Sequence, residues 1–90
     1  MSVRIGAWKL DDVAYDRDAD VLYLSIGPPR PGTGEETPEG HIVRYDDAGE
    51  LMGITIVGAR LLVDAGEPVY VTVSQRSEVS MQELAPALGG

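Results

Sequence analysis

The sequence predicts a mainly β (α+β) fold, an antiparallel β-meander of four to five strands built from two hairpins, with a short C-terminal helix. Three observations support this prediction. An apolar segment, an acidic turn and a second apolar segment occur twice, around 16–20 and around 46–49. Within these segments, apolar and polar side chains alternate with the period of two that strands have. Near the end of the chain, apolar residues recur instead at helical spacing.

The first hairpin is predicted to join a strand that starts near Trp8 and ends at 13–15 to a second strand at 21–26. The turn between them, 16–20, contains three aspartates. Their short carboxylates can accept hydrogen bonds from backbone N–H groups two residues further on. One face of the second strand carries three aliphatic residues, and we expect this face to pack in the core. These residues are Leu22, Leu24 and Ile26.

The segment 27–40 is predicted to be a long loop. It contains four prolines, three glutamates and several glycines. Because proline donates no hydrogen bond to a sheet, this composition excludes a central strand. Loops of this length are uncommon in compact domains and are either mobile or functional, and the composition favours disorder. If the loop binds a partner, its charges would make the contacts. These are Glu35, Glu36 and Glu39.

The second hairpin is predicted from strands at 42–45 and 51–57. Gly49 fits the left-handed backbone position that follows a type I turn in a hairpin loop. Residues 58–63 are ambiguous, because a short apolar run fits one helical turn and the end of a strand equally well. Further on, 69–73 is predicted to be a fifth strand with its three valines on one face.

A C-terminal helix is predicted to start after Ser80, because Ser80 and Glu83 have the spacing of a capping box. Apolar residues then recur at helical intervals and form a stripe. The stripe consists of Met81, Leu84, Ala85 and Leu88. Pro86 disfavours the last turn because an interior proline removes a hydrogen bond, so a short helix and an irregular tail both stay open. Such a stripe is typical of packing, and a terminal amphipathic segment can also bind a partner.

Ninety residues without an internal linker favour a single domain, 1–90. The chain has no Phe, so aliphatic residues must fill a thin core, and we expect marginal stability. A homodimer is predicted because a second copy would cover sheet edges and apolar surface. Cysteine is absent, which excludes disulfides and cysteine-based zinc sites.

The chain carries 15 acidic and 7 basic residues, a formal net charge of −8. This charge disfavours nucleic acids and anionic membranes as partners and favours a basic protein, such as a toxin-like nuclease. An acidic surface can also serve solubility alone. We find no segment with the pattern of a signal peptide or a membrane helix, so a cytoplasmic location is expected.

The residues predict no catalytic, cofactor or metal site. Asp16, Asp18 and Asp20 have the spacing that begins a calcium loop, but Val21 and Gly27 stand where that loop needs glycine and glutamate. We therefore interpret the aspartates as a solvated turn.

Other catalytic patterns are incomplete as well. His41 is the only histidine and is expected to be exposed or to cap a strand. It could pair with Ser25 or Ser74 as in a hydrolase, but neither serine lies in a nucleophile elbow. Gly32-x-Gly34 lacks the lysine of a phosphate-binding loop and precedes two glutamates. The sequence therefore favours a protein that is not an enzyme, although carboxylate acid/base chemistry stays open.

Several short motifs together resemble a bacterial and archaeal family known as domain of unknown function 2283. The motifs are Tyr15-Asp16, Ala19-Asp20-x-Leu22-Tyr23, Glu36, Val43-x-Tyr45-Asp46-x-x-Gly49 and Gly53-Ile54-x-Ile56-x-x-Ala59. The resemblance covers about residues 15–60. It implies a compact β-meander with a short helical piece and no established catalytic residues. Some members look like the smaller partners of toxin-like proteins in paired operons, which implies an antitoxin role. The proline-rich loop and the segment after Val63 depart from the family pattern.

Three functional hypotheses follow. In the first, the protein is a non-enzymatic interaction module, antitoxin-like in one form, that presents acidic residues or the C-terminal stripe to a basic partner. The partner-binding residues would be Glu35, Glu36, Asp46, Asp47, Met81, Leu84 and Leu88. In the second, it is a small ligand-binding protein or enzyme with a pocket between the sheet and the long loop or at a dimer interface. In the third, it is a structural subunit of a larger assembly.

Overall fold

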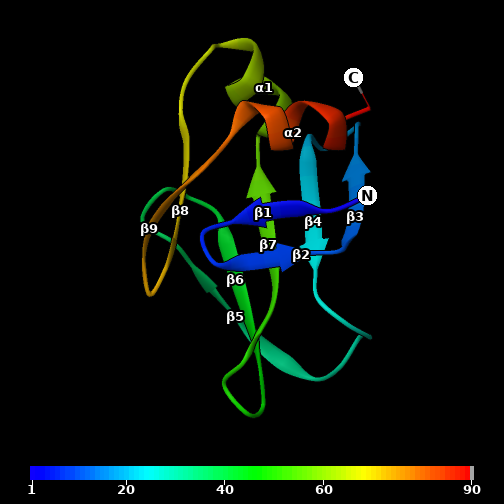
Figure 1. Ribbon diagram of the computed structural model, residues 1–90, viewed down its shortest axis with the longest axis vertical. Coiled ribbons are helices and arrows are strands. Elements are labelled where there is room, and N and C mark those ends of the chain that lie inside the picture. The colour runs from blue at the N-terminus through cyan, green and yellow to red at the C-terminus, as the bar shows by residue number, and fades with distance from the viewer. Residues whose placement is uncertain (90) are drawn as a thin grey trace.

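The main sheet of the computed structural model, which describes residues 1–89, has five antiparallel strands in the order β3-β4-β7-β6-β5 (Figure 1). These strands are β3 Asp12–Asp16, β4 Val21–Ser25, β5 Gly32–Glu36, β6 Ile42–Asp46 and β7 Leu51–Val57. Two separate hairpins are β1 Val3–Ile5 with β2 Trp8–Leu10, and β8 Val69–Val73 with β9 Gln75–Val79. The helices are α1 Ala59–Asp64 and α2 Met81–Ala87. The mainly β prediction with a short C-terminal helix is confirmed.

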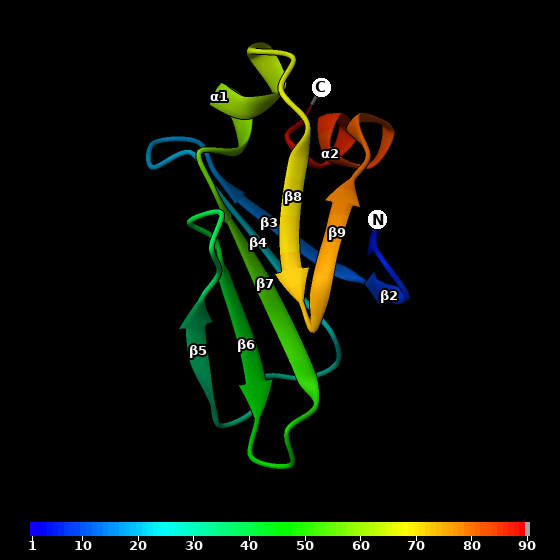
Figure 2. The ribbon, with the colours of Figure 1, turned by 90° about the vertical axis from the view of Figure 1, so that its left-hand side faces the viewer.

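One face of the main sheet forms the floor of the core. In the sheet register, Leu24 lies opposite both Val13 and Ile54, and Leu22 lies opposite Ile56. Both hairpins and α2 lie on this side of the sheet (Figure 2). Together they bury a second apolar layer, in which each side chain is 0–1% exposed. This layer includes Val3, Ile5, Leu10, Val69, Val71, Val73, Val79, Leu84 and Leu88. The predicted core face is confirmed at Leu22 and Leu24, while Ile26 follows β4 and is only partly buried. The three valines of β8 share one face as predicted, and this face is buried.

The segment expected to be a loop, 27–40, contains the edge strand β5. The prediction of a loop was wrong for Gly32–Glu36, while the exclusion of a central strand was correct, because β5 pairs only with β6. Pro31 and Pro38 lie just outside the strand, where a missing N–H breaks no hydrogen bond of the sheet. An edge position therefore accommodates a composition that a central strand would not.

Two other segments differ from the expectation or resolve it. The N-terminal residues form the hairpin β1–β2, and β2 ends before β3 begins. The prediction of one continuous strand that starts near Trp8 was therefore wrong.

The ambiguous segment 58–63 contains the start of helix α1. Gly49 has a φ of 82°, which confirms its left-handed turn position. Neither α1 nor α2, the helices of the described chain, has the length and apolarity to cross a membrane.

His41 is buried, with 3% of its surface exposed, so the expectation of an exposed residue was wrong. It lies just before β6, and its ring Nδ1 accepts a hydrogen bond from the backbone N–H of Val57 at 3.1 Å. Its own backbone N–H donates to the Thr37 hydroxyl at 3.1 Å. His41 thus caps the end of strand β7, in agreement with the alternative prediction that it caps a strand. Because Nδ1 accepts a hydrogen bond, the imidazole must be neutral.

The stability of the protein is expected to fall as the pH decreases below about 6.5, where an unfolded histidine takes up a proton. Burial lowers the pKa of His41, and the charge of Glu39 opposes this only in part. A lowered pKa means that the contribution of His41 is complete above pH 6.5 and is lost as the pH falls toward the pKa of the folded state. The measurement is the urea midpoint between about pH 5 and pH 7.5.

The control is His41→Asn, which keeps an acceptor near the Nδ1 position but does not titrate. The other carboxylates are unchanged in both proteins, so the difference between the two pH profiles reports His41 together with its interaction with Glu39. Parallel profiles would contradict the prediction.

Candidate functional site

The side of the main sheet that faces away from both hairpins and α2 is called here the outer face (Figure 2). Its side chains follow from the register of the sheet, which alternates between the two sides along each strand. They are Asp12, Ala14 and Asp16 on β3; Val21, Tyr23 and Ser25 on β4; Gly53, Thr55 and Val57 on β7; Ile42 and Arg44 on β6; and Gly34 and Glu36 on β5. Neither the two separate hairpins nor α2 cover this face of the sheet.

Three large apolar side chains on the outer face are exposed: Tyr23 at 49%, Val57 at 43% and Ile42 at 37%. A solvated face of an antiparallel sheet normally carries polar residues at such positions. Carboxylates stand at both margins of the face, Asp12 and Asp16 on the edge strand β3 and Glu36 on the edge strand β5. Exposed apolar side chains on the inner strands, with carboxylates at the margins, are typical of a binding surface.

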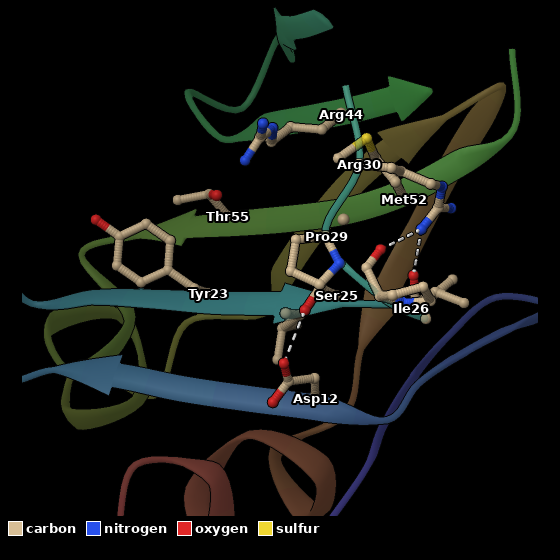
Figure 3. A pocket seen from close by; sticks show the side chains of 13 residues that line it. Asp12, Tyr23, Ser25, Ile26, Pro29, Arg30, Arg44, Met52 and Thr55 are labelled. Atoms are coloured by element: carbon tan, nitrogen blue, oxygen red, sulfur yellow. Dashed lines mark hydrogen bonds between the residues drawn. The ribbon is translucent and has the colours of Figure 1, made fainter. Parts of the chain in front are cut away.

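A pocket of about 240 Å³ lies where the outer face meets the segment that follows β4 (Figure 3). Arg30 holds this segment in place. Its guanidinium donates to the carbonyl oxygens of Ile26 at 2.8 Å and Pro28 at 3.1 Å, and to the Asp46 carboxylate at 3.0 Å. The pocket is lined by polar side chains from four strands, which are Asp12, Tyr23, Ser25, Arg44 and Thr55, together with Met52 and the segment itself. It occupies the place between sheet and loop where the ligand-binding hypothesis puts a pocket.

The comparisons with known proteins identify the part of the chain that forms the main sheet. A family model described as protein of unknown function (DUF2283) matches residues 12–60, more than half of the chain. The chain belongs to this family. No curated protein and no solved structure matches it.

The DUF2283 region runs from the start of β3 into α1 and so contains all five strands of the main sheet. The hairpins β1–β2 and β8–β9 and helix α2 lie outside the matched residues. The outer face and its pocket are therefore formed by the DUF2283 region, whereas the layer that covers the opposite face is not.

The acidic residues predicted to bind a partner have different environments. Glu35, Glu36 and Asp47 are exposed, the first two on the edge strand β5 and the third in the β6–β7 turn. Asp46 is engaged within the fold: its carboxylate accepts hydrogen bonds from the backbone N–H groups of Glu50 at 2.9 Å and Ala48 at 3.0 Å and pairs with Arg30. These contacts, the Glu50 bond first, hold the pKa of Asp46 below its ordinary value. Asp46 thus shapes both the turn and the pocket wall.

The apolar residues predicted to bind a partner lie elsewhere. Leu84 and Leu88 are 0% and 1% exposed, and only Met81 of the three is partly exposed. Helix α2 contacts β1, β3 and α1, so its stripe packs within the domain. In Figure 1, α2 lies at the top of the molecule and β5 near the bottom left. The structure therefore does not bring the acidic and apolar candidates together.

Asp20 is a residue of the DUF2283 region whose role the sequence did not reveal. Its carboxylate accepts hydrogen bonds from the Tyr15 hydroxyl at 2.7 Å and from the backbone N–H groups of Arg60 at 2.7 Å and Leu61 at 3.1 Å. It thereby caps the first turn of α1, whose adjacent residue Gly58 offers no side-chain cap. Burial raises the pKa of Asp20, but the hydrogen bonds outweigh burial and leave that pKa lowered.

The other aspartates of the first turn behave as the solvated-turn interpretation predicts. The Asp16 carboxylate accepts hydrogen bonds from the backbone N–H groups of Asp18 at 3.1 Å and Ala19 at 3.2 Å. Within residues 1–89, no cluster of three histidine or carboxylate side chains has the arrangement of a metal site. The aspartates of this segment therefore serve the hairpin and α1.

Proposed function

We propose that this DUF2283 protein is a non-enzymatic binding module that docks a basic protein on its outer face. The observation that supports the proposal is the exposure of Tyr23, Ile42 and Val57 on the uncovered side of the sheet. The chain supplies its own second layer for the opposite side, so these side chains are not needed to build the core. Their exposure costs solubility, and binding a partner would remove this apolar surface from water.

The charge of the chain argues for a basic partner. The net charge of −8 attracts a cationic protein over distances beyond contact, and the carboxylates at both margins of the outer face would pair with cationic groups of that protein. Two copies of the chain would instead repel each other. A homodimer through the same face stays a prediction, and a basic partner is the occupant that the charge favours.

An antitoxin-like role is one form of this function. A toxin-like nuclease has a cationic surface for the phosphate backbone of its substrate, and a small acidic protein can occupy such a surface. In that role, the exposed carboxylates Glu35, Glu36 and Asp47 would approach the nuclease from the β5 end of the sheet.

The double variant Ile42→Thr, Val57→Thr is expected to weaken partner binding at least tenfold, because two of the three exposed apolar side chains of the outer face are lost. Threonine keeps the β-branched shape that suits strands. The matched control is Leu61→Gln, because Leu61 is 70% exposed but lies on α1 and not on a strand of the main sheet. The measurement is affinity capture from the native host at low and high salt, followed by titration with the purified partner.

The proposal requires that the Leu61→Gln variant captures a basic protein and that the double variant does not. High salt should release this protein from the complex. Equal capture by both variants would exclude the outer face as the docking site. Sedimentation of the purified protein tests whether a second copy of the chain occupies the outer face instead. If the protein is a dimer, the double variant is a monomer and no partner is captured, the occupant is a second copy and not a basic protein.

A further inference from the structure

We propose that the pocket beside Arg44 binds a small oxyanion, a carboxylate or a phosphate. The inference does not depend on the protein-binding function, because it follows from the side chains of the pocket alone. It assigns a ligand class to a site on a chain whose overall charge is negative, and it identifies Arg44 as the recognition residue.

Arg44 has an unusual setting on the outer face. In the register of the sheet it lies opposite Gly53 on β7 and Gly34 on β5, so neither cross-strand neighbour has a side chain. Within residues 1–89, the ion pairs are Arg30 with Asp46 and Arg76 with Glu39. Arg44 takes part in neither of these ion pairs. Its guanidinium is therefore available to a ligand.

A hydroxyl group lies beside the guanidinium. Figure 3 shows the end of Arg44 directed along β7 toward the Thr55 hydroxyl, whereas the Tyr23 side chain lines the pocket with its ring and its hydroxyl points away from Arg44. A guanidinium presents N–H donors in a planar fork that matches carboxylate and phosphate oxygens, and hydroxyls can add further donors. An oxyanion offers only acceptors at neutral pH, so this donor set suits it.

The size of the pocket and the carboxylate at the end opposite Arg44 indicate where an anion would bind. A volume of about 240 Å³ has room for a phosphate or a carboxylate group. Asp12 lies at the other end, where Ser25 donates a long hydrogen bond to it at 3.4 Å. Its negative charge would repel an anion there and direct it to the Arg44 end. The three hydrogen bonds of Arg30 keep the pocket wall in place.

The test is an NMR titration of the ¹⁵N-labelled full chain at constant ionic strength with inorganic phosphate, with succinate and with the peptide acetyl-Gly-Glu-Gly-amide. Saturable shifts are expected at the amides of Gly53 and Thr55 and at the Arg44 Nε. Arg44→Gln should weaken binding about tenfold or more, the factor expected for loss of a charged hydrogen bond. The matched control Arg4→Gln, which changes the net charge equally on the exposed side of β1, should leave the affinity unchanged.

Preferential binding of the free anions would indicate a small-molecule ligand, whereas preferential binding of the peptide would indicate a carboxylate carried by a protein; either result supports the site. Non-saturating shifts with all three probes, or equal shifts in Arg44→Gln and Arg4→Gln, would overturn it. If Arg44→Gln fails to fold, Thr55→Val removes one hydroxyl without changing the side-chain shape and is expected to weaken binding several-fold.

Discussion

Asp20→Ala is expected to lower the free energy of unfolding by about 2–4 kcal/mol, the sum of a lost helix cap and lost charged hydrogen bonds. Its carboxylate joins the β3–β4 turn to the first turn of α1 by accepting from Tyr15, Arg60 and Leu61. Removing it leaves two N–H groups of α1 without their acceptor and the Tyr15 hydroxyl without its partner. The effect should therefore extend to α1 and not stay within the hairpin turn.

Urea denaturation at neutral pH measures the loss, with Asp18→Ala as the control. Asp18 is exposed in the same turn and is expected to contribute less than about 0.5 kcal/mol. The loss of stability in Asp20→Asn should lie between those of Asp20→Ala and Asp18→Ala, because asparagine keeps one acceptor and tolerates the positive φ of 55°. Since the pKa of Asp20 is lowered, its contribution is complete above pH 3.8 and is lost as the pH falls below that value. Equal effects of Asp20→Ala and Asp18→Ala would refute this role.

The second large effect is expected for Leu84→Ala, which should destabilise the protein by about 3 kcal/mol. Leu84 is completely buried where α2 packs on the rest of the domain, so alanine leaves a cavity and loses apolar contacts. Stability in a chain of this size is small, so the variant can lose much of its folded population. Leu84→Met conserves volume and should cost less than about 1.5 kcal/mol.

Thermal and urea unfolding of the isolated protein check this effect, with Gln82→Ala on the exposed side of α2 as the control. The experiment also separates the two interpretations of the stripe. If Leu84 and Leu88 instead gripped a partner, Leu84→Ala would leave the stability of the isolated chain unchanged and reduce only partner binding.

The two hairpin turns show how much of the site could be predicted. Gly49 lies within the turn that it serves, so turn chemistry alone predicted its position. Asp46 was predicted to bind a partner, and the structure instead engages its carboxylate in the same turn. The direction of Tyr23 away from the core was predicted from the period of two in β4. The alternation did not reveal that this side of the sheet stays uncovered, because the hairpins that cover the other side come from residues far along the chain.

β5 and His41 show where such reasoning stops. The composition of 32–36 indicates a loop, and only the pairing of this segment with β6 makes it a strand. His41 follows a glycine at a strand start, which suggests exposure, yet the N–H of Val57 and the packing around it decide that the ring is buried and neutral. Tertiary contacts override weak local preference in both cases.

The sequence by itself determined the acidic character, the alternating strands, the two turns and the C-terminal helix, because composition and hydrogen bonds between near neighbours are written in consecutive residues. Only the tertiary structure decided which face of the sheet stays open, that Arg44 lies between two glycines, and that Asp20 caps a helix 40 residues away. These features depend on the register between strands and on contacts between distant segments. A local pattern specifies a strand's faces but not what will lie against them.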